Sequence, residues 1–243
     1  MCASKIISGG GKRLRSTEVT TLVQSIAETE AIGPFGDLTI FRGQAFRRCL
    51  LPGIARKDPK VDTNDLERTV LKQLTLQGAA LLGQAAPTDL DLMVVAQHFG
   101  LKTRLLDWSS NPLAALWFAC SNRADGDVYV YALEADDLLA EDIYSKDPFA
   151  AAKTRVIQPR LNNSRIVAQS GWFTLHRYSK KARRFVPLES NADASPFLHE
   201  ICIPARSRKA ILWSLDRHGV TSSTLFPDLE GLCSQLNRKY RLI

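Results

Sequence analysis

A block of polar residues enclosed between two helix signals constrains the fold of this chain more than any other stretch. The block covers residues 96–119 and has the sequence AQHFGLKTRLLDWSSNPLAALWFA. Before it, Thr88 is followed by Asp91 three residues later, which is the pattern of a helix capping box, and Gly100 marks the end of the predicted helix. The polar block therefore begins in the last turn of a helix.

A second helix is expected within the block itself. Ser110 or Asn111 can accept hydrogen bonds from the first N–H groups of this helix, and Pro112 suits its first position, where no hydrogen-bonded N–H is needed. Residues 113–118 read LAALWF, which makes the helix apolar nearly all round. Such a helix should be buried, so the polar residues before it should be held against a core.

The polar side chains of the block are candidates for a binding or catalytic site. Polar groups fixed between buried elements must be hydrogen-bonded within the protein or must serve a ligand. The candidates are Gln97, His98, Thr103, Arg104, Asp107, Trp108 and Ser109. A purely structural interpretation is also open, in which Asp107 caps the turn, Arg104 pairs with it or with a neighbour, and His98 is satisfied at the helix end.

A short strand with an arginine at its end is expected upstream of the block. Residues 38–41 read LTIF, which is typical of a strand, and they run into Arg42 and Gly43. The glycine permits a ligand to approach the backbone, and the arginine places a planar fork of donors beside it. The alternative is a glycine bulge with a surface arginine.

The C-terminal half contributes a smaller group of candidates. Residues 165–169 and 172–175 are expected to form a two-stranded hairpin that carries Arg165 and Gln169. Pro227 should open the last helix. The first turn of that helix holds two acids, which the helix dipole favours there regardless of function; they are Asp228 and Glu230.

The order of these elements indicates the fold class. Further strands are expected at residues 128–133 and 197–203, and helices at residues 64–78 and 207–218. Strands and helices therefore mix without a regular βαβ alternation. This pattern favours an α+β fold, with a mixed or antiparallel sheet core flanked by helices.

Composition narrows the class of protein. The chain has 243 residues, of which 45% are hydrophobic and 23% charged, so it can bury a sizeable core. It has neither an apolar signal sequence near the N-terminus nor a run of about 18 apolar residues, so we expect a cytoplasmic protein without a membrane partner. The five cysteines lack CxxC and Cys/His spacings, which predicts reduced thiols and no metal site.

The charge balance favours an anionic partner. The formal net charge is +7 and the sequence pI is about 9.3. Nucleic acid, a nucleotide or an acidic protein would suit such a surface. The excess is spread over residues 12–15, 180–184, 206–209 and 238–241. Clusters of this size are also common on faces that only meet solvent.

Three segments together resemble the FRG domain family. They are FRG at residues 41–43, the block at residues 96–119, and LFPDLEGL at residues 225–232. The resemblance implies an FRG domain core over residues 35–135. Residues 136–243 would then form the C-terminal part of the same α+β domain.

The residues before the FRG domain core divide into two expected parts. Residues 1–15 contain three successive glycines followed by basic residues and offer nothing to bury, which predicts a flexible leader. Residues 16–34 should hold an N-terminal helix, because apolar residues recur there at helical spacing from Val19 to Ile26.

A second likeness, at the level of layout, is to the ADP-ribosyltransferases, which are α+β folds that bind NAD in a cleft. It consists of an arginine leaving an early strand, a Thr/Ser-containing block before an apolar helix, and a later acidic residue. The resemblance implies NAD as the cofactor and Arg42 on one of its phosphates or riboses, with Thr103 or Ser109 supporting that wall. An acidic residue would stabilise the oxocarbenium-like transition state.

The identity of the acid and of the other binding residues remains open in this comparison. No Glu-x-Glu or Gln-x-Glu pair follows the block, so the acid would be Asp107, Asp228, Glu230 or Glu200. His98 could orient the ribose or act as an acid or base near neutral pH. Trp108 could stack on a base. Further groups that could contact the nucleotide are Gly43, Gln97, Arg104, Arg165 and Gln169.

The leading hypothesis is an NAD-dependent ADP-ribosyltransferase or NAD glycohydrolase that acts on a protein or nucleic-acid acceptor, as a toxin or defence effector. It requires Arg42, His98, Thr103 and Asp107 to converge on one pocket. Two alternatives remain. A non-enzymatic nucleic-acid or nucleotide-binding module would use the basic residues Lys180, Lys181, Arg183 and Arg184, and a protein-interaction domain would have no polar pocket.

Overall fold

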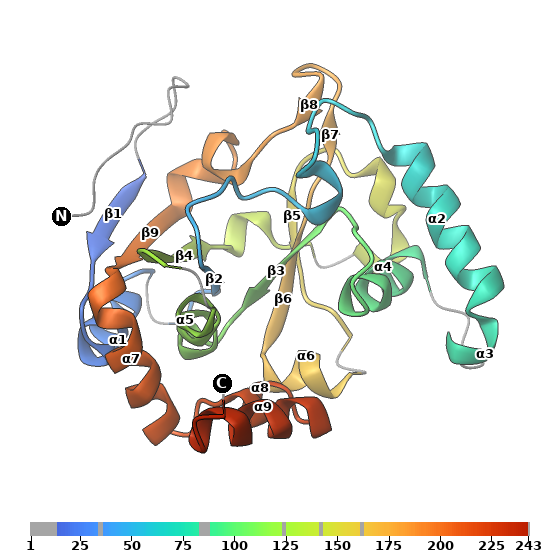
Figure 1. The fold of residues 1–243 in the computed structure, drawn as a ribbon. Helices are drawn as coiled ribbons and strands as arrows, with labels where there is room; N and C mark the ends of the chain where they lie inside the picture. The colour runs from blue at the N-terminus through green and yellow to red at the C-terminus, as the bar shows by residue number, and fades with distance from the viewer. Residues whose placement is uncertain are drawn as a thin grey trace.

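Seven strands form one mixed sheet at the centre of the molecule (Figure 1). The computed structural model describes residues 14–33, 36–82, 88–122, 125–140, 143–160 and 163–242. The strands, in sheet order, are β1 (Arg15–Glu18), β9 (Leu198–Ile203), β4 (Val128–Glu134), β2 (Thr39–Gln44), β3 (Leu105–Ser109), β6 (Gly171–Leu175) and β5 (Arg155–Ile157). β1 and β9 are parallel and the other neighbours antiparallel, which confirms the α+β class.

The helices lie around this sheet, and a separate hairpin projects from it (Figure 1). The hairpin consists of β7 (Tyr178–Ser179) and β8 (Arg184–Phe185). The helices are α1 (Leu22–Glu30), α2 (Asn64–Gln77), α3 (Ala79–Leu82), α4 (Asp89–His98), α5 (Pro112–Ser121), α6 (Ser164–Ala168), α7 (Ala205–Arg217), α8 (Ser222–Leu225) and α9 (Leu229–Lys239).

The sheet is split between β2 and β3. β2 pairs with β4 at six successive positions, and β3 pairs with β6 at five. Between β2 and β3, however, the register contains one pair, Phe41 with Ser109. The main-chain ladder therefore joins two half-sheets at a single point. Beyond that point, the strands diverge and leave backbone groups that need other partners.

The apolar helix α5 lies across the split. Asn111 caps it, because the Asn111 side chain accepts hydrogen bonds from the N–H groups of Leu113 and Ala114, and Pro112 occupies the first position. These features confirm the helix expected from the sequence. α5 packs on β2 and β4 and forms a core cluster with α1, α7 and α8, so most of its residues are buried.

Gly43 permits this close packing of α5. A Cβ atom at residue 43 would lie 2.0 Å from the carbonyl oxygen of Ala115 and 2.6 Å from the backbone nitrogen of Ala119. Both of these are main-chain atoms of a helix, so they cannot turn aside as a flexible side chain would. The sequence predicted that a ligand approaches the backbone at Gly43. In the structure, helix α5 makes that close approach.

Two of the remaining core clusters are built by other segments. α2 and α4 cover apolar residues of β3, β5 and β6, and the capping box of α4 between Thr88 and Asp91 is present as expected. A further cluster packs loop and 3-10 segments, including Leu50, Leu138 and Leu188, against residues of β2, β3 and β4.

Two predicted elements differ in the structure. Residues 15–18 form β1 along the edge of β9, and the N-terminal helix begins only at Leu22, because Thr21 caps it. Residues 165–168 lie in the short helix α6, which Asn163 caps at its start and which Gln169 follows, so the predicted hairpin retains only its second strand. Pairing with β9 makes residues 15–18 a strand, and side-chain caps at Thr21 and Asn163 set where α1 and α6 begin. Residues 1–13 of the expected leader lie outside the described ranges.

The prediction of reduced thiols holds for only some of the cysteines that the structure describes. Cys49, Cys120 and Cys233 are free, whereas Cys202 is disulfide-bonded, so the prediction of reduced thiols is wrong for Cys202. Within the described ranges, no helix combines the length and apolar character that crossing a membrane requires.

Replacing Gly43 with alanine should destabilise the fold by about 1–3 kcal/mol or more, because the new methyl group overlaps the α5 backbone. The measurement is the free energy of unfolding from denaturant titration. Gly53→Ala is the matched control, since the nearest atoms to a Cβ there belong to Lys102 at 3.6 Å, an ordinary contact distance. Equal stability of the two variants would show that α5 does not need the glycine.

Candidate functional site

A pocket of about 330 Å³ opens where β2 and β3 diverge. We call it the β2–β3 pocket. Residues from both strands, from α5 and from the C-terminal part of the chain line it. They are Phe41, Arg42, Gly43, Ala45, Asp107, Trp108, Ser109, Ala115, Phe118, Asn122, Gln169 and Phe226. Its volume falls at the lower end of the roughly 300–1,000 Å³ that small-molecule pockets occupy.

Arg42 bridges the split from the β2 side. Its Nη1 atom donates a hydrogen bond of 2.6 Å to the backbone carbonyl of Asp107 and lies 3.7 Å from the Asp107 carboxylate. The side chain is 15% exposed, and its Nε atom has no hydrogen-bond partner among the described residues. Burial lowers the pKa of Arg42 to about 10, so the guanidinium stays charged at neutral pH. Arg42 thus brings a positive charge to the pocket wall.

Asp107 supplies the carboxylate on the opposite wall, and its side chain is 55% exposed. Gln97, in the last turn of α4, donates a hydrogen bond of 3.0 Å to its Oδ2 atom. Thr103 in turn donates a hydrogen bond of 2.9 Å to the Gln97 side chain and accepts one from the backbone of Leu105. Gln97 and Thr103 therefore hold the carboxylate in place. Thr103 is buried, so it supports the pocket rather than lining it.

His98 lies beside this group, outside the pocket lining. Burial and the positive charge of Arg165 lower the pKa of His98, while Asp107 and Asp228 act in the opposite direction. The neutral imidazole therefore predominates at pH 7, where it can accept a proton. Its ring contacts Phe99 edge-on at 5.0 Å.

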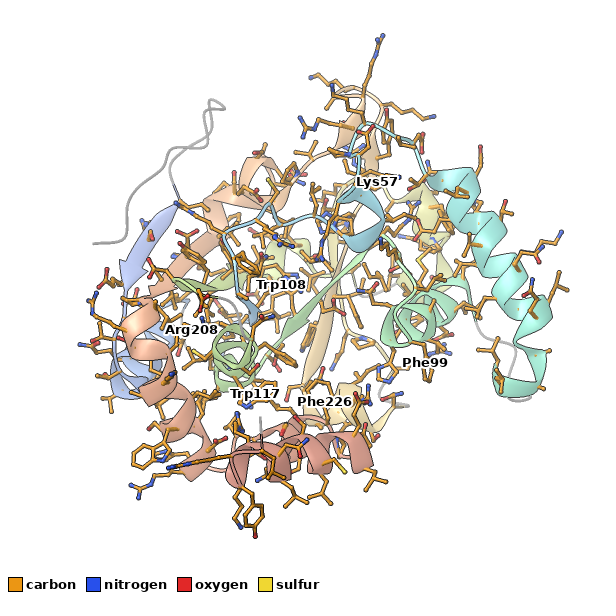
Figure 2. The ribbon with its side chains drawn as sticks, viewed as in Figure 1. Lys57, Phe99, Trp108, Trp117, Arg208 and Phe226 are labelled. Carbon is orange, nitrogen blue, oxygen red and sulfur yellow. The ribbon has the colours of Figure 1, made fainter. Side chains whose placement is uncertain are left out.

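Trp108 and Ser109 are held by the protein itself. The indole of Trp108 is buried in the interior (Figure 2), and its Nε1 atom donates a hydrogen bond of 3.0 Å to Thr174. Thr174 is also hydrogen-bonded to the buried His176 at 3.0 Å. Ser109 donates to the carbonyl oxygen of Gln169 at 2.6 Å. The polar atoms of Trp108 and Ser109 are therefore already hydrogen-bonded within the pocket wall.

Arg104 points away from the pocket into a buried ion pair. Its Nε atom lies 2.7 Å from the carboxylate of Glu67, and Nη2 donates to Asn64 at 2.7 Å. The guanidinium also lies over the ring of Phe149, at 4.2 Å. Arg104 and Glu67 are both nearly inaccessible to solvent. This arginine therefore links the start of β3 to α2. Arg104 does form an ion pair, but its partner is Glu67 and not Asp107.

Arg165, Asp228 and Glu230 form a second charged group, next to the pocket. Arg165 lies 2.6 Å from the carboxylate of Asp228 and 3.3 Å from that of Glu230. Asp228 caps α9, and hydrogen bonds from the Gly231 backbone and from Arg165 lower its pKa. Both acids are thus engaged by the protein and neither lines the pocket.

Two further predicted residues have clear positions. Gln169 lines the pocket, and its side chain donates a hydrogen bond of 3.0 Å to the carbonyl oxygen of Leu225. Glu200 is buried and accepts hydrogen bonds from Ser16, Arg47 and Tyr131, so all its contacts are structural. Of the four candidate acids, only Asp107 lines the pocket.

Sequence reasoning missed the aromatic wall of the pocket. Phe118 of α5 and Phe226 contact each other edge-on at 5.9 Å, and Phe226 also contacts Trp117 at 6.1 Å (Figure 2). Arg165 lies over the ring of Phe226 at 5.3 Å. The signal was present in the LFPDLEGL segment, but nothing in the spacing showed that it meets α5.

The structure offers no preformed metal site in the ranges that it describes. No group of three His, Cys, Asp or Glu side chains lies close enough there to hold an ion. The polar character of the β2–β3 pocket comes instead from one guanidinium, one carboxylate, the side-chain amides of Asn122 and Gln169 and one hydroxyl, with aromatic rings beside them. This combination suits an organic ligand that carries both charge and flat rings.

Comparison with protein families gives a match over part of the chain. Residues 37–128 match the model of the FRG domain. The matched range contains Arg42, Gln97 and Asp107, whereas Phe226 falls outside it. Neither curated proteins nor solved structures yield a match. The layout-level likeness to ADP-ribosyltransferases therefore gains no support from relatives.

His176 should make the stability of the fold depend on pH. Burial, together with the positive charges of Arg42 and Arg104, lowers the pKa of His176 to about 3. An unfolded histidine titrates near 6.5, so the stabilisation is complete above that pH and is lost progressively as pH falls toward 3. The contribution of this one group is about 1.4 kcal/mol per pH unit inside that window.

The free energy of unfolding, measured from pH 8 to pH 4, tests this. His176→Gln keeps a polar atom for Thr174 but does not titrate, so it should have a shallower slope by about one proton. The pH 8 values of the two proteins provide the reference for any effect unrelated to protonation. Parallel curves over the whole range would show that His176 protonates freely in the folded protein.

Proposed function

We propose that this FRG domain-containing protein binds an NAD-like nucleotide in the β2–β3 pocket and breaks the bond between its ribose and nicotinamide. The observation that supports the proposal best is the pairing of Arg42 with Asp107 across the split in the sheet. One side chain carries a positive charge and the other a half-exposed carboxylate, in one pocket of about 330 Å³. A nucleotide with phosphates and a cationic ring needs both.

Arg42 would bind the phosphates or a ribose of the nucleotide. Its guanidinium lines the pocket and is held in position by the carbonyl oxygen of Asp107. A fixed guanidinium suits a phosphate because its planar donors match two oxygen atoms at once. Phe118 and Phe226 would lie along the flat rings of the ligand. The pocket volume suits the nicotinamide half, with the remainder extending toward solvent.

Asp107 would act on the ribose during the reaction. When the bond between C1′ and the nicotinamide nitrogen breaks, its electron pair passes to nicotinamide, which leaves as a neutral molecule. Positive charge then develops on the ribose ring, and a carboxylate beside it stabilises that charge. Gln97 and Thr103 support this role, because they fix the carboxylate before the substrate arrives.

The second half of the reaction needs a nucleophile and a proton acceptor. Water, or a hydroxyl, amine or carboxylate of an acceptor, would form the new bond to C1′ with its own electron pair. A water molecule or a protonated nucleophile then loses a proton, and His98 is suited to receive it because its neutral form predominates at pH 7. With water the product is ADP-ribose. With a protein or nucleic acid it is an ADP-ribosylated acceptor, as a toxin or defence effector would make.

A second candidate function is nucleic-acid binding through the β7–β8 hairpin. The Phe185 backbone donates a hydrogen bond to the carbonyl oxygen of Pro59, and Tyr178 donates one to that of Lys60. The hairpin therefore packs on the loop that carries Lys57, which lies near the hairpin in Figure 2. The exposed basic residues that the two segments bring to one end of the molecule are Lys57, Lys60, Lys180, Lys181 and Arg183.

The NAD reaction predicts a specific loss in Asp107→Asn. Nicotinamide release from NAD, measured with and without mixed protein, DNA and RNA acceptors, should fall by about 10²–10³-fold. Asparagine has nearly the same shape and can still accept from Gln97, so the fold should be preserved. Asp137→Asn, at an exposed position outside the pocket, is the matched control. No release by the folded parent protein under any of these conditions would contradict the proposal.

The binding-module candidate predicts a different result. Replacing Lys180, Lys181 and Arg183 with alanine should reduce the slope of log affinity for DNA or RNA against log salt concentration by about two to three, through lost counterion release. Alanine at Lys72 and Lys209, on α2 and α7, should leave the slope nearly unchanged. An affinity that does not vary with salt would exclude phosphate binding by the hairpin.

A further inference from the structure

The last helix, α9, packs on the molecule with its polar side. A Cβ at Gly231 would lie 2.0 Å from the carbonyl oxygen of Phe226, so the helix backbone is in close contact there. The Gln235 side chain accepts a hydrogen bond of 3.3 Å from Thr221. Arg238 forms an ion pair of 2.5 Å with Asp216 of α7. These three positions share one side of the helix, because they are spaced by four and three residues.

The opposite side of α9 is apolar and faces solvent. Leu229 is 75% exposed, Leu232 44%, Leu236 40% and Tyr240 63%. Their spacing of three, four and four residues places them in one stripe along the helix. The thiol of Cys233 is free and is exposed on the same side.

This orientation is the reverse of the usual one for a helix at a protein surface. A surface helix normally turns its apolar stripe to the core and its polar residues to water. Here Gly231, Gln235 and Arg238 take the inner positions and the leucines the outer ones. α9 also lies at the outer edge of the molecule (Figure 1). A contiguous exposed apolar stripe of this kind marks an interaction surface.

The charges at the two ends of α9 indicate what covers the stripe. Asp228 and Glu230 lie at its N-terminal end, where Arg165 neutralises one of the two charges. Lys239 and Arg241 are exposed at its C-terminal end. Two α9 helices in antiparallel contact would therefore place the acidic end of each against the basic end of the other. The arrangement is self-complementary, as an interface with two-fold symmetry requires.

We infer that the outer stripe of α9 binds a second copy of this chain in an antiparallel helix pair. With the two-fold axis beside residues 234 and 235, Leu229 lies opposite Tyr240 of the second copy and Cys233 opposite Leu236. The two Cys233 residues are then offset by three positions along the paired helices, about 4.5 Å in rise. The inference does not depend on the proposed NAD chemistry, because no residue of the outer stripe lines the pocket.

The first test is the mass of the whole chain in solution. Sedimentation at a series of micromolar concentrations should give a dimer, and Leu232→Glu with Leu236→Glu should weaken dimerisation by more than about tenfold. Leu66→Glu, at a leucine of α2 that is 58% exposed, is the matched control and should leave the dimer intact. A monomer at every concentration, or a dimer that the α9 substitutions leave unchanged, would overturn the inference.

Two further measurements test the antiparallel geometry. A short bismaleimide reagent should crosslink the parent dimer through Cys233, so crosslinking should disappear in Cys233→Ser and persist in Cys49→Ser. Glu230→Lys should weaken the dimer, and adding Lys239→Glu and Arg241→Glu should restore it. Failure of that restoration would overturn the antiparallel arrangement. A monomer that instead binds anionic lipid vesicles through the same leucines would assign the stripe to a membrane surface and overturn the dimer.

Discussion

The hydrogen bond from Arg42 to the backbone carbonyl of Asp107 stands where the main-chain ladder between β2 and β3 stops. A carbonyl that loses its ladder partner inside a protein must find another donor or incur a free-energy penalty. The guanidinium supplies that donor at 2.6 Å and carries a charge to the same position. One side chain therefore adds a second link between the two half-sheets, next to the pair of Phe41 and Ser109, and makes the opening between them a polar pocket.

The elements around this contact hold the two strands at their divergent spacing. α5 lies directly on Gly43 and buries its apolar residues over β2 and β4, so β2 cannot shift toward β3 without moving a helix. On the other side, the buried pair of Arg104 and Glu67 ties β3 to α2. Removing either partner of a buried ion pair is costly, because the remaining charge is left without compensation. Packing contacts therefore hold β2 and β3 in position on both sides of the split.

The polar residues of the 96–119 block have different roles in the structure, although they are close in sequence. Asp107 and Trp108 line the pocket, Gln97 and Thr103 support Asp107, and Arg104 lies in the core. Alternation along β3 does not explain this distribution, since Asp107 and Trp108 are neighbours on the strand and both line the pocket. The sequence predicted two helices around the block but no strand inside it. Its apolar residues are too few to show a clear period of two.

The sequence by itself determined the local elements and the match of residues 37–128 to the FRG domain. Caps at Thr88 and Asn111, the proline at residue 112 and the apolar residues of 38–41 are local signals, so α4, α5 and the first half of β2 were predictable, whereas β2 continues through Arg42 to Gln44 by pairing with β4. Only the tertiary structure decided that Arg42 meets Asp107 from 65 residues away, that Phe226 meets Phe118, and that the apolar side of α9 turns outward. The physical reason is the distance in sequence over which each kind of interaction acts. Capping and periodicity depend on residues within a turn or two, whereas partners across the sheet are chosen by the packing of the whole chain.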